Sequence, residues 1–352
     1  MIISSSPYWT RHLNFYQHLI IFSDFITFRY MRNIIHITTL LFFIFFLSCS
    51  SEEDSMEVTI TDKAEVDNDQ NIPDKLLNSN STGVFTFSPT GPLSNKNLDI
   101  YYHIPEGDLQ SLPVLFSFHG GSRNAIDYRD DWINMANQND FMVFAPEFNT
   151  DNFPSGDMYN LANIFQDGDN PSLDSFNSPA NWSFSIIDQL FEFIKNEVNG
   201  NQETYNAWGH SAGAQFLHRF IFYLPNSKLN IAVCSNAGWY TVPEMGIPFP
   251  YGLNGSQLEN SNLIDAFSKK LYIHLGAEDN DPNSSSLRHN DIVDDQQGLN
   301  RLVRGRYFFI KSKEMAENLN TQFNWEKTPE VPNVAHNHSA MALDALKYIL
   351  QE

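Results

Sequence analysis

Short apolar runs alternate with amphipathic stretches along most of this chain. The runs predict strands at 83–88, 98–104, 113–118, 141–145, 205–208, 229–234 and 270–275, and an extended segment at 322–332. Apolar residues that recur every three or four positions predict helices at 127–139, 182–198, 214–221, 307–318 and 339–351. Strands alternating with helices over about 270 residues predict one α/β domain with a mostly parallel, twisted sheet flanked by helices.

Two polar stretches interrupt this pattern. The stretch at 147–179 has no helical or strand period and is predicted to be a long loop, and an acidic turn is expected at 291–295. A loop of that length inside a compact domain is typical of either a functional or a disordered segment. The sequence assigns no role to either stretch.

The N-terminal part of the chain has a different pattern. Met31 precedes an arginine, an apolar run at 34–47 and Cys49. A charged start, a short apolar core and a small residue before a cysteine are typical of a secretory signal with a lipobox-like site. Residues 1–48 are therefore expected to be an upstream extension plus a lipoprotein-like signal, with Met31 as the start and Cys49 as the lipidated residue. The residues at 46–47 depart from the commonest lipobox, so an uncleaved membrane anchor stays open.

A polar segment follows the signal. Residues 49–81 are rich in Asp, Glu, Asn and Ser and lack aromatic residues, so they are expected to form a disordered acidic tether. The tract at 50–54 resembles the acidic segment after the lipidated cysteine in surface-exposed lipoproteins of the Bacteroidetes type. The folded domain is expected to span 82–352.

The charge of the chain narrows the classes of partner. The chain has 42 acidic and 21 basic residues and a formal net charge of −21. Contacts with phosphate groups need Lys and Arg, so the charge argues against nucleic acid or an anionic membrane surface as a partner. There are two cysteines, Cys49 and Cys234, and no Cys/His spacing of a metal site. No disulfide framework, metal or cofactor is therefore expected.

The sequence Gly-His-Ser-Ala-Gly at 209–213 lies between a predicted strand and a predicted helix. A serine in this strand-turn-helix context is typical of a nucleophile elbow, in which the glycines allow the sharp turn. Ser211 is therefore the candidate nucleophile. His210 is expected to be structural.

A serine nucleophile needs a base and an acid that orients the base, which follow it in the chain in this fold class. The strand at 270–275 ends in a turn with several carboxylates, of which Asp279 is chosen as the acid and Asp281 stays as the alternative. His336 follows the extended segment and is chosen as the base. His338, two residues on, remains the alternative and is expected to begin the last helix.

A tetrahedral oxyanion also needs hydrogen-bond donors. The strand at 113–118 ends in His-Gly-Gly-Ser, and glycines let the backbone turn its N–H groups toward a substrate. The predicted oxyanion hole consists of the N–H groups of Gly120 or Gly121 and of Ala212, the residue after the nucleophile.

These motifs support a family resemblance. HGGSRNA, APEF, GHSAGAQFLHR, SNAGWY, GAEDNDP and VAHNHSAM resemble motifs of α/β-hydrolases of the polyhydroxybutyrate depolymerase and feruloyl esterase group. The resemblance covers most of the chain after residue 82 and implies an α/β-hydrolase fold. It also implies the triad Ser211, Asp279 and His336. For the substrate it is weak, because the group acts on polyesters, hydroxycinnamoyl esters and acetylated polysaccharide.

The expected function is an exported serine hydrolase that cleaves carboxylic esters through an acyl-enzyme. The alternatives are a serine peptidase of the same fold and a non-catalytic, surface-binding lipoprotein. The expected partners are an ester substrate, with a polysaccharide or a polyester as candidates, and a membrane reached through the lipid. These partners place the protein in the cell envelope, with secretion as the alternative. Aromatic residues after a strand end can line an acyl or sugar site, and the candidates are Trp239, Tyr240, Phe249 and Tyr251.

Overall fold

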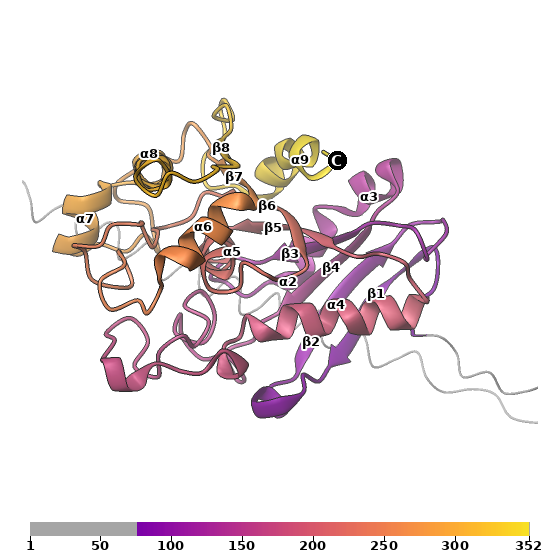
Figure 1. Cartoon of the computed structure of the whole chain (residues 1–352). Helices are drawn as coiled ribbons and strands as arrows, with labels where there is room; N and C mark the ends of the chain where they lie inside the picture. Colours follow the sequence, from indigo (N-terminus) through magenta and orange to yellow (C-terminus); the bar gives the residue numbers. More distant parts are fainter. Residues whose placement is uncertain (1–75, 352) are drawn as a thin grey trace, which may run out of the picture. The chain divides into compact units, whose positions relative to one another are not determined.

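The computed structural model describes residues 76–351, and the signal, the start at Met31, Cys49 and most of the tether lie outside them (Figure 1). The described part is built on an eight-stranded sheet in the order β1-β2-β4-β3-β5-β6-β7-β8. The strands are β1 (Ser81–Phe87), β2 (Leu98–Ile104), β3 (Val114–Phe118), β4 (Met142–Glu147), β5 (Tyr205–His210), β6 (Leu229–Ser235), β7 (Lys270–His274) and β8 (Trp325–Lys327). β1 and β2 pair antiparallel with their neighbours, and all other pairs are parallel.

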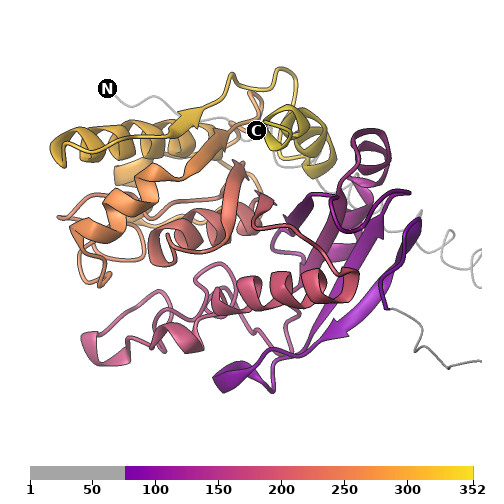
Figure 2. The same cartoon turned by 45° about the vertical axis from the view of Figure 1, so that its right-hand side comes forward.

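Helices cover both faces of the sheet. They are α2 (Ala125–Asp130), α3 (Ile133–Asn139), α4 (Ser185–Val198), α5 (Ala212–Tyr223), α6 (Asn260–Ser268), α7 (Asp291–Gln297), α8 (Arg301–Asn318) and α9 (His338–Ile349), with short 3-10 turns at Gly91–Leu93, Leu173–Ser175 and Pro179–Asn181. One core joins the sheet to α4, α5, α6 and α8, and a second core joins its other face to α2, α3 and α9. Figure 2 shows α9 across the sheet from α4.

The two cores follow from the alternation of side chains along the strands. In β3, Phe116 and Phe118 belong to the larger core and Leu115 to the smaller one, because successive side chains point to opposite faces. Both faces are buried, which is why the central strands are continuous apolar runs. The predicted α/β architecture and mostly parallel sheet are confirmed.

Three predicted elements differ from the structure. The helix predicted at 127–139 is two helices, α2 and α3. The acidic turn predicted at 291–295 is the helix α7, which Asn290 caps by accepting a hydrogen bond from the Val293 N–H at 3.0 Å. Asn300 caps α8 in the same way, so this helix begins at Arg301 and not at residue 307.

The long loop at 147–179 packs against the body of the domain. Phe165 and Phe176 form an isolated β-bridge within the loop, and the ring of Phe165 contacts that of Phe249 with 5.0 Å between centroids. Asp169 forms an ion pair with Arg288, in the segment before α7. The loop is therefore held by side-chain contacts although it has little regular structure.

Candidate active site

Ser211 lies in the sharp turn between β5 and α5. Its backbone has φ 57° and ψ −114°, a conformation that a residue with a side chain rarely adopts. A Cβ atom on Gly209 would lie 2.5 Å from the Gly213 carbonyl carbon, and one on Gly213 would lie 2.1 Å from the Phe118 carbonyl oxygen. The turn therefore requires glycine on both sides of the serine, as a nucleophile elbow does.

The acid and base candidates meet beyond the end of β7. His336 Nδ1–H donates a hydrogen bond of 2.7 Å to Asp279 Oδ2, and Asp279 is buried with 4% of its surface exposed. The alternative acid, Asp281, accepts a hydrogen bond of 2.8 Å from the Asn283 N–H within its own turn and is exposed. The structure thus joins His336 to Asp279 and leaves Asp281 as a turn cap.

Asn236 ties together the two loops that carry this pair. Its side chain accepts a hydrogen bond from the Gly276 N–H at 2.8 Å and donates one to the Ala335 carbonyl at 3.2 Å. A Cβ on Gly276 would lie 2.5 Å from the Val334 carbonyl oxygen, so the loops pack backbone to backbone. Asn236 was not predicted to be a site residue, although it lies in the motif SNAGWY directly after a buried strand.

Arg301 is the second partner of the buried carboxylate. Its Nη1 lies 3.3 Å from Asp279 Oδ1 and donates a hydrogen bond of 2.7 Å to Ser284 Oγ. The Arg301 and Asp279 side chains are 1% and 4% exposed. The carboxylate therefore lies between a guanidinium and the imidazole of His336. The sequence carried no signal for this contact.

The predicted oxyanion loop approaches the serine. A Cβ on Gly120 would lie 3.7 Å from Ser211 Cβ, which places this backbone beside the nucleophile. Among the described residues, the N–H groups of Gly121 and Ala212 donate no hydrogen bond. Two backbone donors at the serine are thus available to an oxyanion.

His119 holds the start of this loop. Its Nδ1–H donates to the Gly120 carbonyl at 2.9 Å, and its Nε2 accepts from the Phe148 N–H at 3.0 Å. Burial lowers the pKa of His119 to about 3, so the ring is neutral, as its one donor and one acceptor require.

The candidate nucleophile, base and oxyanion donors line one cavity of about 550 Å³. Ser211, Gly121, Ala212 and His336 all contribute to it, together with polar side chains from Asn124, Gln215 and Ser286. Within residues 76–351, no hydrogen bond joins Ser211 to His336; such bonds are often long before substrate binds. The cavity combines a strained serine, a carboxylate-bound imidazole and free backbone donors, and these are the groups that acyl transfer by a serine requires.

The fold matches solved structures. Poly(aspartic acid) hydrolase-1 from Sphingomonas sp. KT-1 is 33% identical, with a TM-score of 0.72 over 78% of this chain and 100% of that one. The chain belongs to the α/β-hydrolase superfamily. A poly(3-hydroxybutyrate) depolymerase from Bordetella parapertussis is 25% identical, with a TM-score of 0.69 over 77% of this chain and 89% of that one. No protein-family model matches the chain, and no curated protein matches it significantly.

The aromatic residues predicted to bind substrate do not line the cavity of this hydrolase. Trp239, Tyr240, Phe249 and Tyr251 are all buried. Tyr240 stacks on Phe308 with 4.4 Å between centroids, in the core beneath α8. Their rings pack against neighbouring side chains, and a role for them in substrate binding stays a prediction.

His338, the alternative base, begins α9 and has a carboxylate partner of its own. His338 Nδ1–H donates a hydrogen bond of 2.5 Å to Asp131 Oδ2. Its ring stacks on Tyr128 with 4.7 Å between centroids and 18° between planes, and it lines the same cavity as Ser211. The hydrolase therefore holds two histidine–carboxylate pairs at one cavity, of which only His336 pairs with Asp279.

His210 packs behind the base. Its ring lies 4.4 Å from that of His336, and Tyr128 forms a hydrogen bond of 3.1 Å with its Nδ1. Burial and the nearby His336 and His338 lower the pKa of His210 well below its usual value. A neutral ring at this position supports His336 by packing without adding charge.

Proposed function

We propose that this α/β-hydrolase is a serine carboxylic ester hydrolase that works through an acyl-enzyme. The observation that carries the proposal is the Asp279–His336 hydrogen bond beside the strained Ser211 in a shared cavity. Among the described residues, no group of three or more His, Cys, Asp or Glu side chains could hold a metal ion. The proposed chemistry uses protein groups alone.

The proposed reaction begins when Ser211 Oγ attacks the ester carbonyl carbon and His336 Nε2 takes the hydroxyl proton. Asp279 accepts the Nδ1–H bond, which fixes the tautomer with its free lone pair on Nε2 and stabilises the imidazolium that forms. The oxyanion accepts hydrogen bonds from the N–H groups of Gly121 and Ala212. Removing one such donor typically costs about 3 kcal/mol of transition-state stabilisation.

Collapse of the tetrahedral intermediate breaks the bond to the alcohol, which leaves with the proton from His336. Water then attacks the acyl-Ser211 carbonyl and gives a proton to His336. The second collapse returns that proton to Ser211 Oγ and releases the carboxylic acid. Every proton that leaves Ser211 or water therefore passes through one imidazole.

The proposed substrate is a polyester or an acylated polymer. The similar depolymerase is named for the polyester poly(3-hydroxybutyrate). The similar hydrolase at 33% identity is named for poly(aspartic acid), an amide-linked polymer, which favours amide hydrolysis as a second candidate activity. An ester and an amide of one acyl group, assayed side by side, separate the two: an esterase cleaves the ester far faster, and an amidase cleaves both.

A serine variant tests the proposal. Ser211→Ala should abolish hydrolysis of a short p-nitrophenyl ester, whereas Ser268→Ala, at the exposed end of α6, should retain it. Retained turnover in Ser211→Ala would refute the serine mechanism. A wild-type protein that turns over neither ester nor amide would favour the non-catalytic binding lipoprotein.

We also propose export and lipid anchoring at Cys49, on the sequence pattern alone. Among residues 76–351, none of the helices has the length and apolar character needed to cross a bilayer. The proposed anchor is tested by fractionating cells that express Cys49→Ala. Release of this variant from the membrane supports lipidation, and a variant that stays membrane-bound contradicts it.

A further inference from the structure

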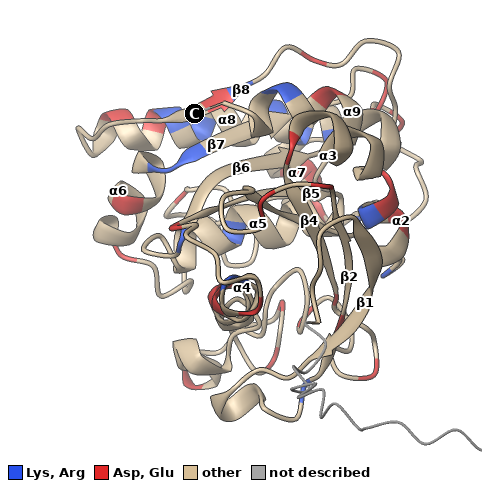
Figure 3. Cartoon of the chain, turned by 90° about the vertical axis from the view of Figure 1, so that its right-hand side faces the viewer, with Lys and Arg blue, Asp and Glu red and all other residues tan. Residues whose placement is uncertain are grey.

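The cavity at Ser211 is lined by no acidic residue among those described, although the chain as a whole is strongly acidic. Acidic residues outnumber basic ones by 42 to 21, and they occur on helices on several sides of the domain, including α4 and α6 (Figure 3). None of the described residues that line the cavity is an Asp or a Glu, whereas His210, His336 and His338 all line it. A cavity free of carboxylates in an acidic protein is suited to a negatively charged ligand.

His338 is rigidly placed at the wall of this cavity. Its backbone is set by the start of α9, where Asn337 accepts a hydrogen bond from the Ala340 N–H at 2.8 Å. Its ring is fixed by the 2.5 Å bond to Asp131 and by stacking on Tyr128. An imidazole held on three sides loses little freedom when it binds a ligand.

The free edge of the ring is Nε2. The carboxylate of Asp131 only accepts hydrogen bonds, so the proton of a neutral His338 lies on Nδ1. Nε2 has no hydrogen-bond partner in the described part of the chain, and the side chain is 30% exposed, so a ligand in the cavity can reach it. Protonation would turn Nε2 into a charged donor at the cavity wall.

The surroundings of His338 favour that protonation. The hydrogen bond to Asp131 raises the pKa of His338, burial opposes this, and the charges of Asp131 and Asp127 add to the rise. The other ionisable groups near the ring are Tyr128 on α2, whose pKa is raised by burial, His210 at the end of β5, which is held neutral, and His336 in the segment before α9. No cation on α2 or β5 contacts the ring in the described part of the chain to oppose the charge.

We propose that His338 Nε2–H binds a carboxylate carried by the ester substrate, so that the enzyme prefers esters with an anionic group near the scissile bond. The neutral side chains of Asn124, Gln215 and Ser286 line the same cavity and place no negative charge against such a group. This inference rests on the proposed function and specifies its substrate class.

Two matched pairs of esters test the proposal. On the acyl side, mono(4-nitrophenyl) adipate is compared with its methyl ester, and on the alcohol side, 4-acetoxybenzoate is compared with its methyl ester. In the wild-type protein at pH 6.5, kcat/KM should be higher for the anionic ester of at least one pair by about tenfold, the typical effect of a charged hydrogen bond. The ratio within a pair is the measured quantity, so a general loss of activity cancels.

Two variants assign the preference to this residue. His338→Gln should lower the ratio to near one. Asp131→Asn keeps the ring but removes the charge that raises its pKa, so the preference should be lost at a lower pH than in the wild type. In the wild type and in Asp131→Asn the ratio should fall as pH rises, because the imidazolium exists below the pKa of His338. A purely structural role would not move this pH dependence.

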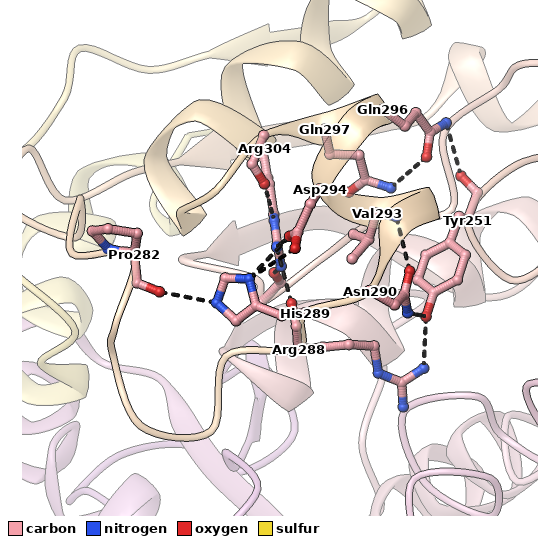
Figure 4. A network of polar contacts seen from close by, with 12 residues as sticks. Tyr251, Pro282, Arg288, His289, Asn290, Val293, Asp294, Gln296, Gln297 and Arg304 are labelled. Carbon is pink, nitrogen blue, oxygen red and sulfur yellow. Dashed lines mark hydrogen bonds and ion pairs between the residues drawn. The ribbon is translucent and has the colours of Figure 1, made fainter.

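A histidine–carboxylate pair outside this cavity provides the control. His289 Nδ1 lies 3.0 Å from Asp294 Oδ1 and its Nε2 lies 2.9 Å from the Pro282 carbonyl oxygen (Figure 4). His289 does not line the cavity at Ser211. His289→Gln should therefore leave the ratio unchanged.

A wild-type ratio near one in both pairs, or a ratio unchanged in His338→Gln, overturns the inference while ester hydrolysis stands. If the wild type cleaves no ester, the proposed function fails. Calorimetric binding of benzoate to Ser211→Ala and to Ser211→Ala/His338→Gln then tests the site alone. Weaker binding to the double variant supports the inference, and equal or undetectable binding to both overturns it.

Discussion

The buried contact between Arg301 and Asp279 gives a prediction with a defined magnitude. Two unit charges 3.3 Å apart attract by about 5 kcal/mol at an effective dielectric constant of about 20. Both side chains are almost fully buried, so water does not replace the partner that is lost. Arg301→Met leaves the carboxylate buried without its cation, and breaking a buried pair in this way typically costs about 3–5 kcal/mol. We expect the free energy of unfolding to fall by that amount.

Urea unfolding of four proteins provides the assay: wild type, Arg301→Met, Asp279→Asn and the double variant. The double variant should lose less stability than the two single losses added together, with a coupling of about 2 kcal/mol or more. The matched control is Arg306→Met, which breaks an exposed pair with Glu330 and should cost about 1 kcal/mol or less. A loss in Arg301→Met no larger than in Arg306→Met, or strict additivity, would refute the argument.

Three further predictions concern the supports of the site. Gly213→Ala places a Cβ 2.1 Å from the Phe118 carbonyl oxygen and should lower esterase kcat/KM by about 100-fold or more, whereas Gly246→Ala, with no atom within 4 Å of its Cβ, should not. Asn236→Ala frees the loops of the acid and base and should lower kcat by about tenfold to 100-fold; an unchanged kcat contradicts its positioning role. His119, with its pKa lowered to about 3, stays neutral in the folded state while the unfolded chain takes up a proton below about pH 6.5. As pH falls from 6.5 to 3, the contribution of His119 to the unfolding free energy should therefore decrease by up to about 1.4 kcal/mol per pH unit. Urea unfolding at several pH values should show that the unfolding free energy of His119→Gln depends less on pH than that of the wild type.

The features that could be predicted from the sequence are those with a local signal. Buried strands are continuous apolar runs, and the elbow is a pentapeptide with a glycine two residues to each side of Ser211. Asp279 and His336 could be chosen because each follows a strand in the chain order of this fold class.

The features that were missed depend on contacts between distant segments. Arg301 and Asp279 are 22 residues apart, and Asp131 and His338 are 207 residues apart, so neither spacing carries a periodic signal. The packing of Trp239 also depends on distant segments, because its ring contacts the guanidinium groups of Arg219 and Arg288, at 4.2 and 4.7 Å from the ring centroid. An aromatic residue after a strand can face a cavity or the core, and only the packing of the whole domain decides between them.

The central claim is that Ser211 is a nucleophile activated by the His336–Asp279 pair. Its most direct test is mass spectrometry of the protein after reaction with a fluorophosphonate. We predict one covalent adduct, on the peptide that contains Ser211, formed by the wild type and lost in His336→Ala. An adduct on another residue, no adduct in the wild type, or equal labelling of His336→Ala would contradict the account.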